Sequence, residues 1–166
     1  VQTCALPIYF YSTPYFLNDT LLRIGFKDQE WAPIDKNLVK PTIDLWKSRL
    51  LDVCKLGKEK NFQVIIALQP MIATGNKPLY GDEIAFKRNH IKNHENVAID
   101  IYNGMEQSLT EMNTQCTKAT SLVKVFNNVS EPIYFDDVHV VDHGNEIIAK
   151  NLFNEILPFI PKKFYD

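Results

Sequence analysis

The sequence has little that would direct it to a nucleic acid or to a membrane. Its 166 residues carry 18 basic and 20 acidic side chains, a net charge of only −2, so we expect no basic surface for nucleic acid or anionic lipid. The longest apolar runs, 62–68 and 156–160, are far shorter than the roughly 20 residues that cross a bilayer. The sequence therefore predicts no nucleic-acid partner and no membrane span in this chain.

Cysteine is also scarce. Cys4, Cys54 and Cys116 are the three cysteines, and their spacing matches neither a zinc site nor a disulfide framework. We predict that Cys54 and Cys116 are small buried hydrophobes. Asn18-Asp19-Thr20 and Asn128-Val129-Ser130 match the glycosylation acceptor pattern, but such short matches are frequent by chance. The compartment and the oligomeric state stay open.

The N-terminus lacks a Met, a basic segment and the apolar segment of a signal peptide. Residues 1–8, Val-Gln-Thr-Cys-Ala-Leu-Pro-Ile, resemble the translation of a common sequencing adapter. We expect residues 1–8 to be an artefactual leader, with the protein proper beginning near Tyr9 and the upstream sequence missing. The alternative is an ordinary N-terminal arm that contains Pro7.

After the leader, residues 9–36 form an aromatic segment with one weakly indicated helix, interpreted as a lid-like insertion or a packed surface segment. Residues 37–161 alternate between helix and strand. The expected elements are a helix over 41–58, a strand over 62–68, a loop over 71–81, a helical region over 82–112 broken near 93–96 or at Gly104, a strand over 121–126 and a helix over 144–157. This alternation predicts an α/β fold with parallel strands.

Apolar periodicity supports the two long terminal helices. The stripe expected to be buried on helix 41–58 consists of Ile43, Trp46, Leu50, Val53 and Cys54, with Gly57 marking the exit. The last helix takes Asp142 as N-cap and buries Ile147, Ile148, Leu152, Ile156 and Ile160. The strand 62–68 is apolar on both faces, as a strand covered on both sides would be. Loop 71–81 leaves its carboxyl end, where open α/β sheets bind ligands.

The segment 134–145, Tyr-Phe-Asp-Asp-Val-His-Val-Val-Asp-His-Gly-Asn, carries the clearest chemistry. Asp136 and His139 are three apart on one tight turn, so the carboxylate can hold the imidazole Nδ1–H. The Nε2 atom is then free to take a proton from a nucleophile. Asp137 would face away from this pair. The alternative is a capped turn with an incidental surface histidine.

Asp136, His139, Gly144 and Asn145, followed by an amphipathic helix, resemble the last block of the SGNH (GDSL-type) hydrolases. The resemblance implies a three-layer α/β/α, flavodoxin-like fold with a parallel sheet of strand order 2-1-3-4-5. Residues 37–161 would be the C-terminal part of one such domain, with the N-terminal strands missing. It also implies serine esterase or lipase-type hydrolysis without a cofactor or metal, with His139 as general base and Asp136 orienting it. The substrate would be a small-molecule, lipid or carbohydrate ester.

Two blocks of that family are absent. There is no Gly-Asp-Ser, because none of Ser12, Ser48, Ser108, Ser121 and Ser130 follows a strand and turn. There is no Gly-x-Asn-Asp for the oxyanion hole either, and the nearest echo is Leu17-Asn18-Asp19. We expect that this chain retains the base and has lost the nucleophile, that it does not hydrolyse esters, and that its exposed sheet edge makes it poorly soluble.

Two other classes of function stay open. One is a binding or accessory module that keeps the fold without the chemistry. The other is a metal site, because His139 and His143 are four apart with Asp136, Asp137 and Asp142 nearby. His90, His94 and Glu95 repeat the four-residue spacing. Metal analysis of the purified protein separates this class from the others.

Overall fold

The computed structural model describes residues 35–93 and 95–161. The side chains of 88–96 are not described. All of these residues belong to the compact unit Pro33–Asp166. The elements are η1 (Lys36–Leu38), α2 (Val39–Lys60), β1 (Ile65–Leu68), α3 (Asp82–Asn93), α4 (Glu95–Met112), β2 (Lys118–Ser121), α5 (Asp142–Ile156) and η2 (Leu157–Phe159). The predicted lid-like segment, its helix and the Leu17-Asn18-Asp19 echo lie outside the described residues, apart from the end of that segment at 35–36.

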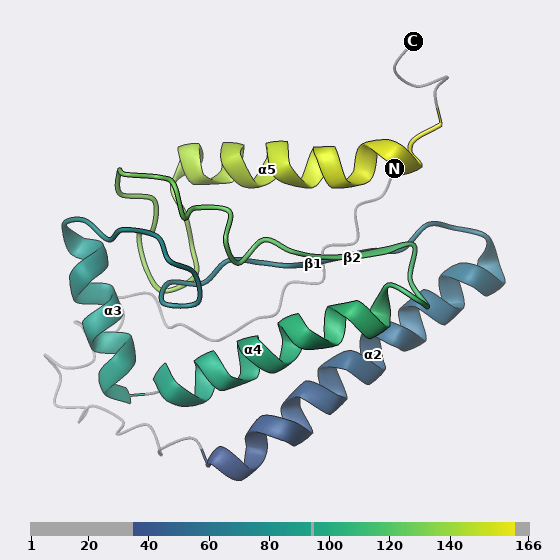
Figure 1. The fold of residues 1–166 in the computed structure, drawn as a ribbon, viewed down its shortest axis with the longest axis horizontal. Helices are drawn as coiled ribbons and strands as arrows, with labels where there is room; N and C mark the ends of the chain where they lie inside the picture. Colours follow the sequence, from purple (N-terminus) through teal and green to yellow (C-terminus); the bar gives the residue numbers. More distant parts are fainter. Residues whose placement is uncertain (1–34, 94, 162–166) are drawn as a thin grey trace, which may run out of the picture. The chain divides into compact units, whose positions relative to one another are not determined.

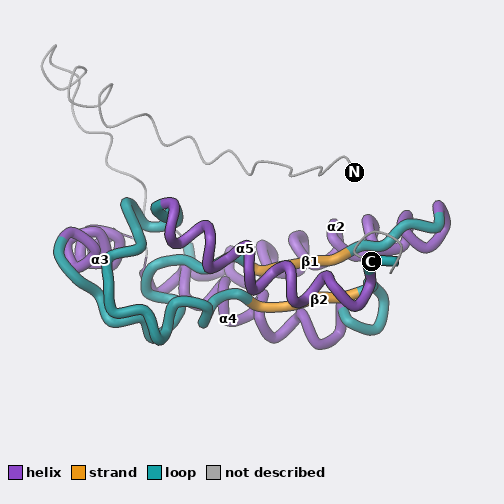
Figure 2. Tube along the Cα trace, turned by 90° about the horizontal axis from the view of Figure 1, so that it is seen from above, coloured by secondary structure: helices purple, strands orange, loops and turns teal. Residues whose placement is uncertain are grey.

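β1 and β2 form a parallel pair, in register from Ile65 opposite Lys118 to Leu68 opposite Ser121. The N–H of Leu122 continues the ladder by donating to the Leu68 carbonyl at 2.8 Å. Figure 1 shows α2 and α4 on one side of this pair and α5 on the other, and Figure 2 shows α5 passing over the strands. The mixed α/β class and the parallel pairing are therefore confirmed, and the sheet within the described residues has two strands.

Helix α2 is longer than predicted. Asn61 ends it in the left-handed conformation, with φ 58° and ψ 48°, which Asn tolerates better than most residues. Gly57 is therefore a buried position inside the helix and not its exit. The predicted stripe is right except at Val53, which is 40% exposed. Cys54 is buried, and Trp46 and Leu50 pack against the same core.

The helical region breaks between α3 and α4, as predicted, and Gly104 lies inside α4 instead of interrupting it. A Cβ on Gly104 would stand 2.2 Å from Ile43 Cδ1. The glycine therefore leaves room for the Ile43 side chain of α2, which would have to move if residue 104 carried a Cβ.

The second strand was misplaced in the prediction, because β2 spans Lys118–Ser121 and not 121–126. The Asn113 side chain pairs with both backbone groups of Ala119, at 2.7 and 2.8 Å, and so fixes the strand directly after α4. The apolar run that follows forms turns, yet Leu122, Val123 and Phe126 are buried in them. A short apolar run does not distinguish a buried turn from a buried strand. The first strand is also shorter than predicted.

Helix α5 begins at Asp142, with Val141 as its N-cap and no side-chain cap. The predicted capping role of Asp142 is therefore wrong, and its carboxylate lies in the first turn, where it complements the helix dipole. The five isoleucine and leucine positions predicted for the inner face are all half-buried. No helix in the described part of the chain combines the length and the hydropathy that crossing a bilayer requires.

Cys54 and Cys116 form a disulfide, with their Cα atoms 4.8 Å apart. The prediction of two unpaired buried cysteines is therefore wrong, although both residues are buried. The bond ties α2 to the turn between α4 and β2, inside the core cluster that contains Val64 and Met112. The two cysteines are 62 positions apart in the sequence, so only the tertiary fold brings them together.

Reduction of this disulfide should lower the free energy of unfolding by about 2 to 4 kcal/mol, because a long closed loop regains its freedom in the unfolded chain. Denaturant titrations of the oxidised and the reduced chain measure the difference. A Cys54→Ala/Cys116→Ala variant is the control, since reductant should leave its midpoint unchanged. Equal midpoints for oxidised and reduced wild-type chain would contradict the expected contribution.

Candidate active site

Asp136 and His139 meet as the sequence predicted. Asp136 Oδ2 lies 2.7 Å from His139 Nδ1. The other carboxylate oxygen, Oδ1, accepts the backbone N–H of Val138 at 2.9 Å and that of His139 at 2.7 Å. Because a carboxylate only accepts hydrogen bonds, this contact favours the tautomer that carries the proton on Nδ1 and leaves Nε2 with its lone pair. Asp136 thus fixes both the turn and the orientation of the imidazole.

The turn is held at the end of a short hairpin-like stem. Tyr134 and Val140 form an isolated antiparallel bridge. The Phe135 N–H donates to the His139 carbonyl at 3.1 Å, and the Val141 N–H donates to the Ile133 carbonyl at 2.8 Å. The residues before Asp136 therefore form a single bridge and not a third strand of the parallel sheet.

Glu83, in the first turn of α3, holds this stem from beneath. Its side chain is 1% exposed. Oε1 accepts the N–H of Ile133 at 2.8 Å and that of Tyr134 at 2.9 Å. Oε2 accepts from Lys77 Nζ at 2.8 Å and from the Tyr80 N–H at 3.0 Å. One buried carboxylate thus joins the loop after β1 to the two residues that lead into the Asp136 turn.

The pKa of Glu83 reflects these contacts. Burial alone would raise it, but the hydrogen bonds from Lys77 and from the backbone N–H groups of Tyr134, Ile133 and Tyr80 together outweigh burial, so the pKa lies below its ordinary value. Burial raises the pKa of the neighbouring Tyr134 phenol, and the Glu83 charge adds to that shift. Glu83 is therefore an anion and Tyr134 a neutral phenol at neutral pH.

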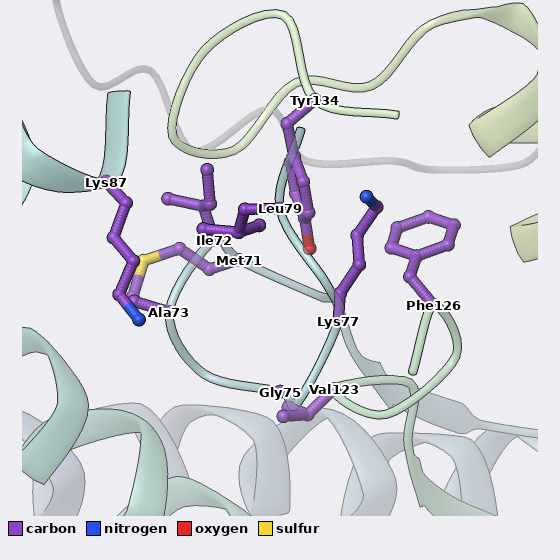
Figure 3. A pocket seen from close by; sticks show the side chains of 10 residues that line it. All are labelled: Met71, Ile72, Ala73, Gly75, Lys77, Leu79, Lys87, Val123, Phe126 and Tyr134. Atoms are coloured by element: carbon purple, nitrogen blue, oxygen red, sulfur yellow. The ribbon is translucent and has the colours of Figure 1, made fainter. Parts of the chain in front are cut away.

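A small cavity lies beside the stem. Figure 3 shows the Tyr134 ring next to the Lys77 side chain and the Phe126 ring, and the two rings pack edge to face with centroids 5.6 Å apart. The cavity measures about 20 Å³, enough for about one water molecule. It is therefore too small to bind a substrate.

A larger depression of about 260 Å³ contains His139 itself. Phe135, Val138 and Ile148 contribute apolar walls, and Gln69 and Asn145 contribute amide groups. Gln69 directly follows β1, so the depression lies at the carboxyl end of that strand, where α/β sheets bind ligands. The Phe135 and His139 rings lie 5.8 Å apart at 37°. This depression, called the groove below, thus offers a mostly apolar surface next to His139.

The Gly-Asn pair of the motif joins the turn to α5. A Cβ on Gly144 would approach Ile133 Cγ2 to 2.7 Å and Val140 Cβ to 2.8 Å, so only glycine lets the helix start against the stem. Asn145 Nδ2 donates to the Val140 carbonyl at 3.4 Å. The loop after β1 reaches the same turn, because the Ile72 N–H donates to the Asp137 carbonyl at 2.9 Å.

The two histidines of the predicted metal alternative have different partners. His143 Nε2 lies 2.9 Å from Glu131 Oε1, and His143 Nδ1 lies 3.6 Å from Glu146 Oε2. His139 faces Asp136 instead. Within the described residues, no group of three or more acidic, histidine or cysteine side chains could hold a metal ion. The side chains of His90, His94 and Glu95 lie outside that description.

Sequence reasoning found the Asp–His pair and missed the groups around it. Glu83 was missed because no spacing signal connects it to residues fifty positions away. Gln69 and Phe135 could have been found, because one ends the strand and the other precedes the motif.

The four serines of the described part lie elsewhere. Ser108 donates to the Gly104 carbonyl and Ser121 donates to Glu106 Oε1, while Ser48 lies in α2 and Ser130 in an exposed loop. None of the hydrogen bonds that His139 makes with described residues involves a serine. Comparison with protein-family models, curated proteins and solved structures gives no match.

Proposed function

We propose that this chain supplies the general base of a serine-type hydrolase of carboxylic esters, with His139 as the base and Asp136 as its orienting partner. The observation that supports it is the 2.7 Å contact between His139 Nδ1 and Asp136 Oδ2, made by a histidine that also lines a groove. The enzyme class and the finer fold, a three-layer SGNH domain, both rest on the resemblance of the motif.

In this proposal Nε2 of His139 takes the proton of a serine hydroxyl as the serine oxygen attacks the ester carbonyl. The imidazolium that forms is stabilised by the Asp136 carboxylate, which remains ionised. The same imidazolium then protonates the leaving alcohol. Water repeats the sequence on the acyl-enzyme, so each turnover consumes one water and releases one acid and one alcohol.

The serine and the oxyanion donors come from outside residues 35–161 in this proposal. The mostly apolar walls of the groove suit an uncharged acyl or alcohol group, because a charged group would lose its hydration there without a partner.

The test uses the product of the complete gene in place of the 166-residue chain, here called the extended protein. We expect it to hydrolyse p-nitrophenyl esters and to be labelled at one serine by a fluorophosphonate, while the 166-residue chain does neither. An extended protein that neither turns over esters nor reacts with the probe would favour a non-catalytic module. Ester turnover by the 166-residue chain would also contradict the proposal.

A further inference from the structure

The second acceptor pattern of the sequence, Asn128-Val129-Ser130, lies at the end of the series of turns after β2. Asn128 and Ser130 are both exposed, and between them Val129 is anchored by its N–H, which donates to the Phe126 carbonyl at 3.0 Å. The Asn128 side chain makes no hydrogen bond to any described residue. Its amide nitrogen is therefore accessible, two residues before a hydroxyl and with no proline between.

Asn127, the preceding residue, has a structural role that Asn128 lacks. Asn127 is half-buried, and its Oδ1 accepts the Asn76 N–H at 2.9 Å. A Cβ on Gly75 would lie 2.9 Å from the same oxygen, so the loop after β1 packs directly on this side chain. A bulky group on Asn127 would break that packing, whereas one on Asn128 would extend into solvent.

The Cys54–Cys116 disulfide indicates a compartment in which Asn128-Val129-Ser130 can be glycosylated. Disulfides such as Cys54–Cys116 form and persist in oxidising compartments and are rare where thiols are kept reduced. N-linked glycans are added to Asn-X-Ser/Thr patterns in the same oxidising compartments. Two features that share no residue thus agree on the environment in which this chain matures.

We propose that Asn128 is an N-glycosylation site, which is used when the chain matures in an oxidising, glycosylating compartment. In the transfer, the Asn128 amide nitrogen displaces a polyprenyl pyrophosphate from the anomeric carbon of a lipid-linked oligosaccharide. A C–N bond forms, the C–O bond to pyrophosphate breaks with its electron pair, and the amide loses one proton. No oxidant or reductant is consumed. The proposal does not depend on the hydrolase activity.

The test is expression of the 166-residue chain with a secretion signal in eukaryotic cells. An Asn18→Gln background leaves Asn128-Val129-Ser130 as the single acceptor pattern in the sequence. We expect one glycan that peptide N-glycosidase removes. We expect its complete loss in Asn128→Gln and in Ser130→Ala, and its retention in Ser130→Thr and in the neighbouring control Asn127→Gln.

Non-reducing peptide mapping of the same sample should show the glycan and the Cys54–Cys116 disulfide on the same molecules. A secreted, disulfide-bonded Asn18→Gln chain without a glycan would overturn the proposal. Cell-free translation with microsomes covers variants that fold too poorly to be secreted. Absence of the glycan from the Asn18→Gln chain in that system as well would equally overturn it.

Discussion

In the extended protein, replacing His139 by alanine should lower the rate of ester hydrolysis on the order of a million-fold. In serine hydrolases the loss of the histidine costs about as much as the loss of the whole triad, because the serine is then no longer deprotonated as it attacks. Among the described residues, the neighbouring histidine His143 should not substitute as the base, since it is engaged by Glu131 and Glu146. kcat should fall and KM should change little.

Two variants sharpen this test. Asp136→Asn should reduce kcat by roughly ten-thousand-fold, because an amide can hold the ring in the wrong tautomer and cannot stabilise the imidazolium. His143→Ala is the matched control, with the same change four residues away, and should leave kcat near the wild-type value. A His139→Ala enzyme that keeps its kcat would exclude His139 as the base.

Replacing Glu83 by alanine should destabilise the chain by about 3 to 5 kcal/mol, the cost of leaving a buried cation without its partner. Lys77 has a side chain only 5% exposed and would lose its only carboxylate partner among the described residues, keeping the Pro78 carbonyl and the Tyr80 ring. Three backbone N–H groups would also lose their acceptor. Since two of these lead into the Asp136 turn, we further expect the Asp136–His139 contact to weaken.

Chemical denaturation of wild-type and variant chains measures the first effect. Glu83→Gln keeps the shape and one acceptor oxygen, so it should lose less than Glu83→Ala. Glu111→Ala removes an exposed carboxylate that pairs with Lys47 at 2.9 Å, and should have little effect. Equal destabilisation by the Glu83→Ala and Glu111→Ala changes would refute the buried role of Glu83.

The same carboxylate gives a sign to the pH dependence. The pKa of Glu83 in the folded chain lies below its ordinary value of 4.5, so the unfolded chain binds the proton more readily. Its contribution to stability is therefore complete above that ordinary value and is lost as the pH falls through the folded pKa. The free energy of unfolding should fall more steeply with acid in wild-type chain than in Glu83→Gln.

The parts of this site that the sequence predicted are those made by neighbours in the chain. Asp136 and His139 are three residues apart, so the geometry of one turn determines their contact. Glu83 and Ile133 are fifty residues apart, and Cys54 and Cys116 are 62 apart. Those contacts depend on how α2, α3 and the stem pack, which no local spacing reveals.

The fold shows the same division. Periodicity over many residues predicted α2 and α5, because a long helix repeats its buried stripe several times. The second strand was misplaced, since four residues carry little periodicity and the Asn113 side chain decides where β2 lies. The sequence therefore predicted the class of fold and the Asp136–His139 pair. The contacts that hold this pair in place depend on tertiary packing.

The position of the ring proton in His139, compared with that in His143, tests most directly the claim that Asp136 orients His139 as a base. This measurement requires neither a nucleophile nor a substrate. Long-range ¹⁵N–¹H spectra of the 166-residue chain, recorded well above the ordinary histidine pKa of roughly 6.5, report which ring nitrogen carries the proton. His139→Gln and His143→Gln identify the signals. The His143 ring should carry its proton on Nε2, which lies 2.9 Å from Glu131 Oε1.

The account predicts that the His139 ring carries its proton on Nδ1, and that Asp136→Ala shifts it toward Nε2 while the His143 ring is unchanged. A His139 ring protonated on Nε2 in the wild-type chain would contradict the account, because the atom that must accept the nucleophile's proton would already carry one.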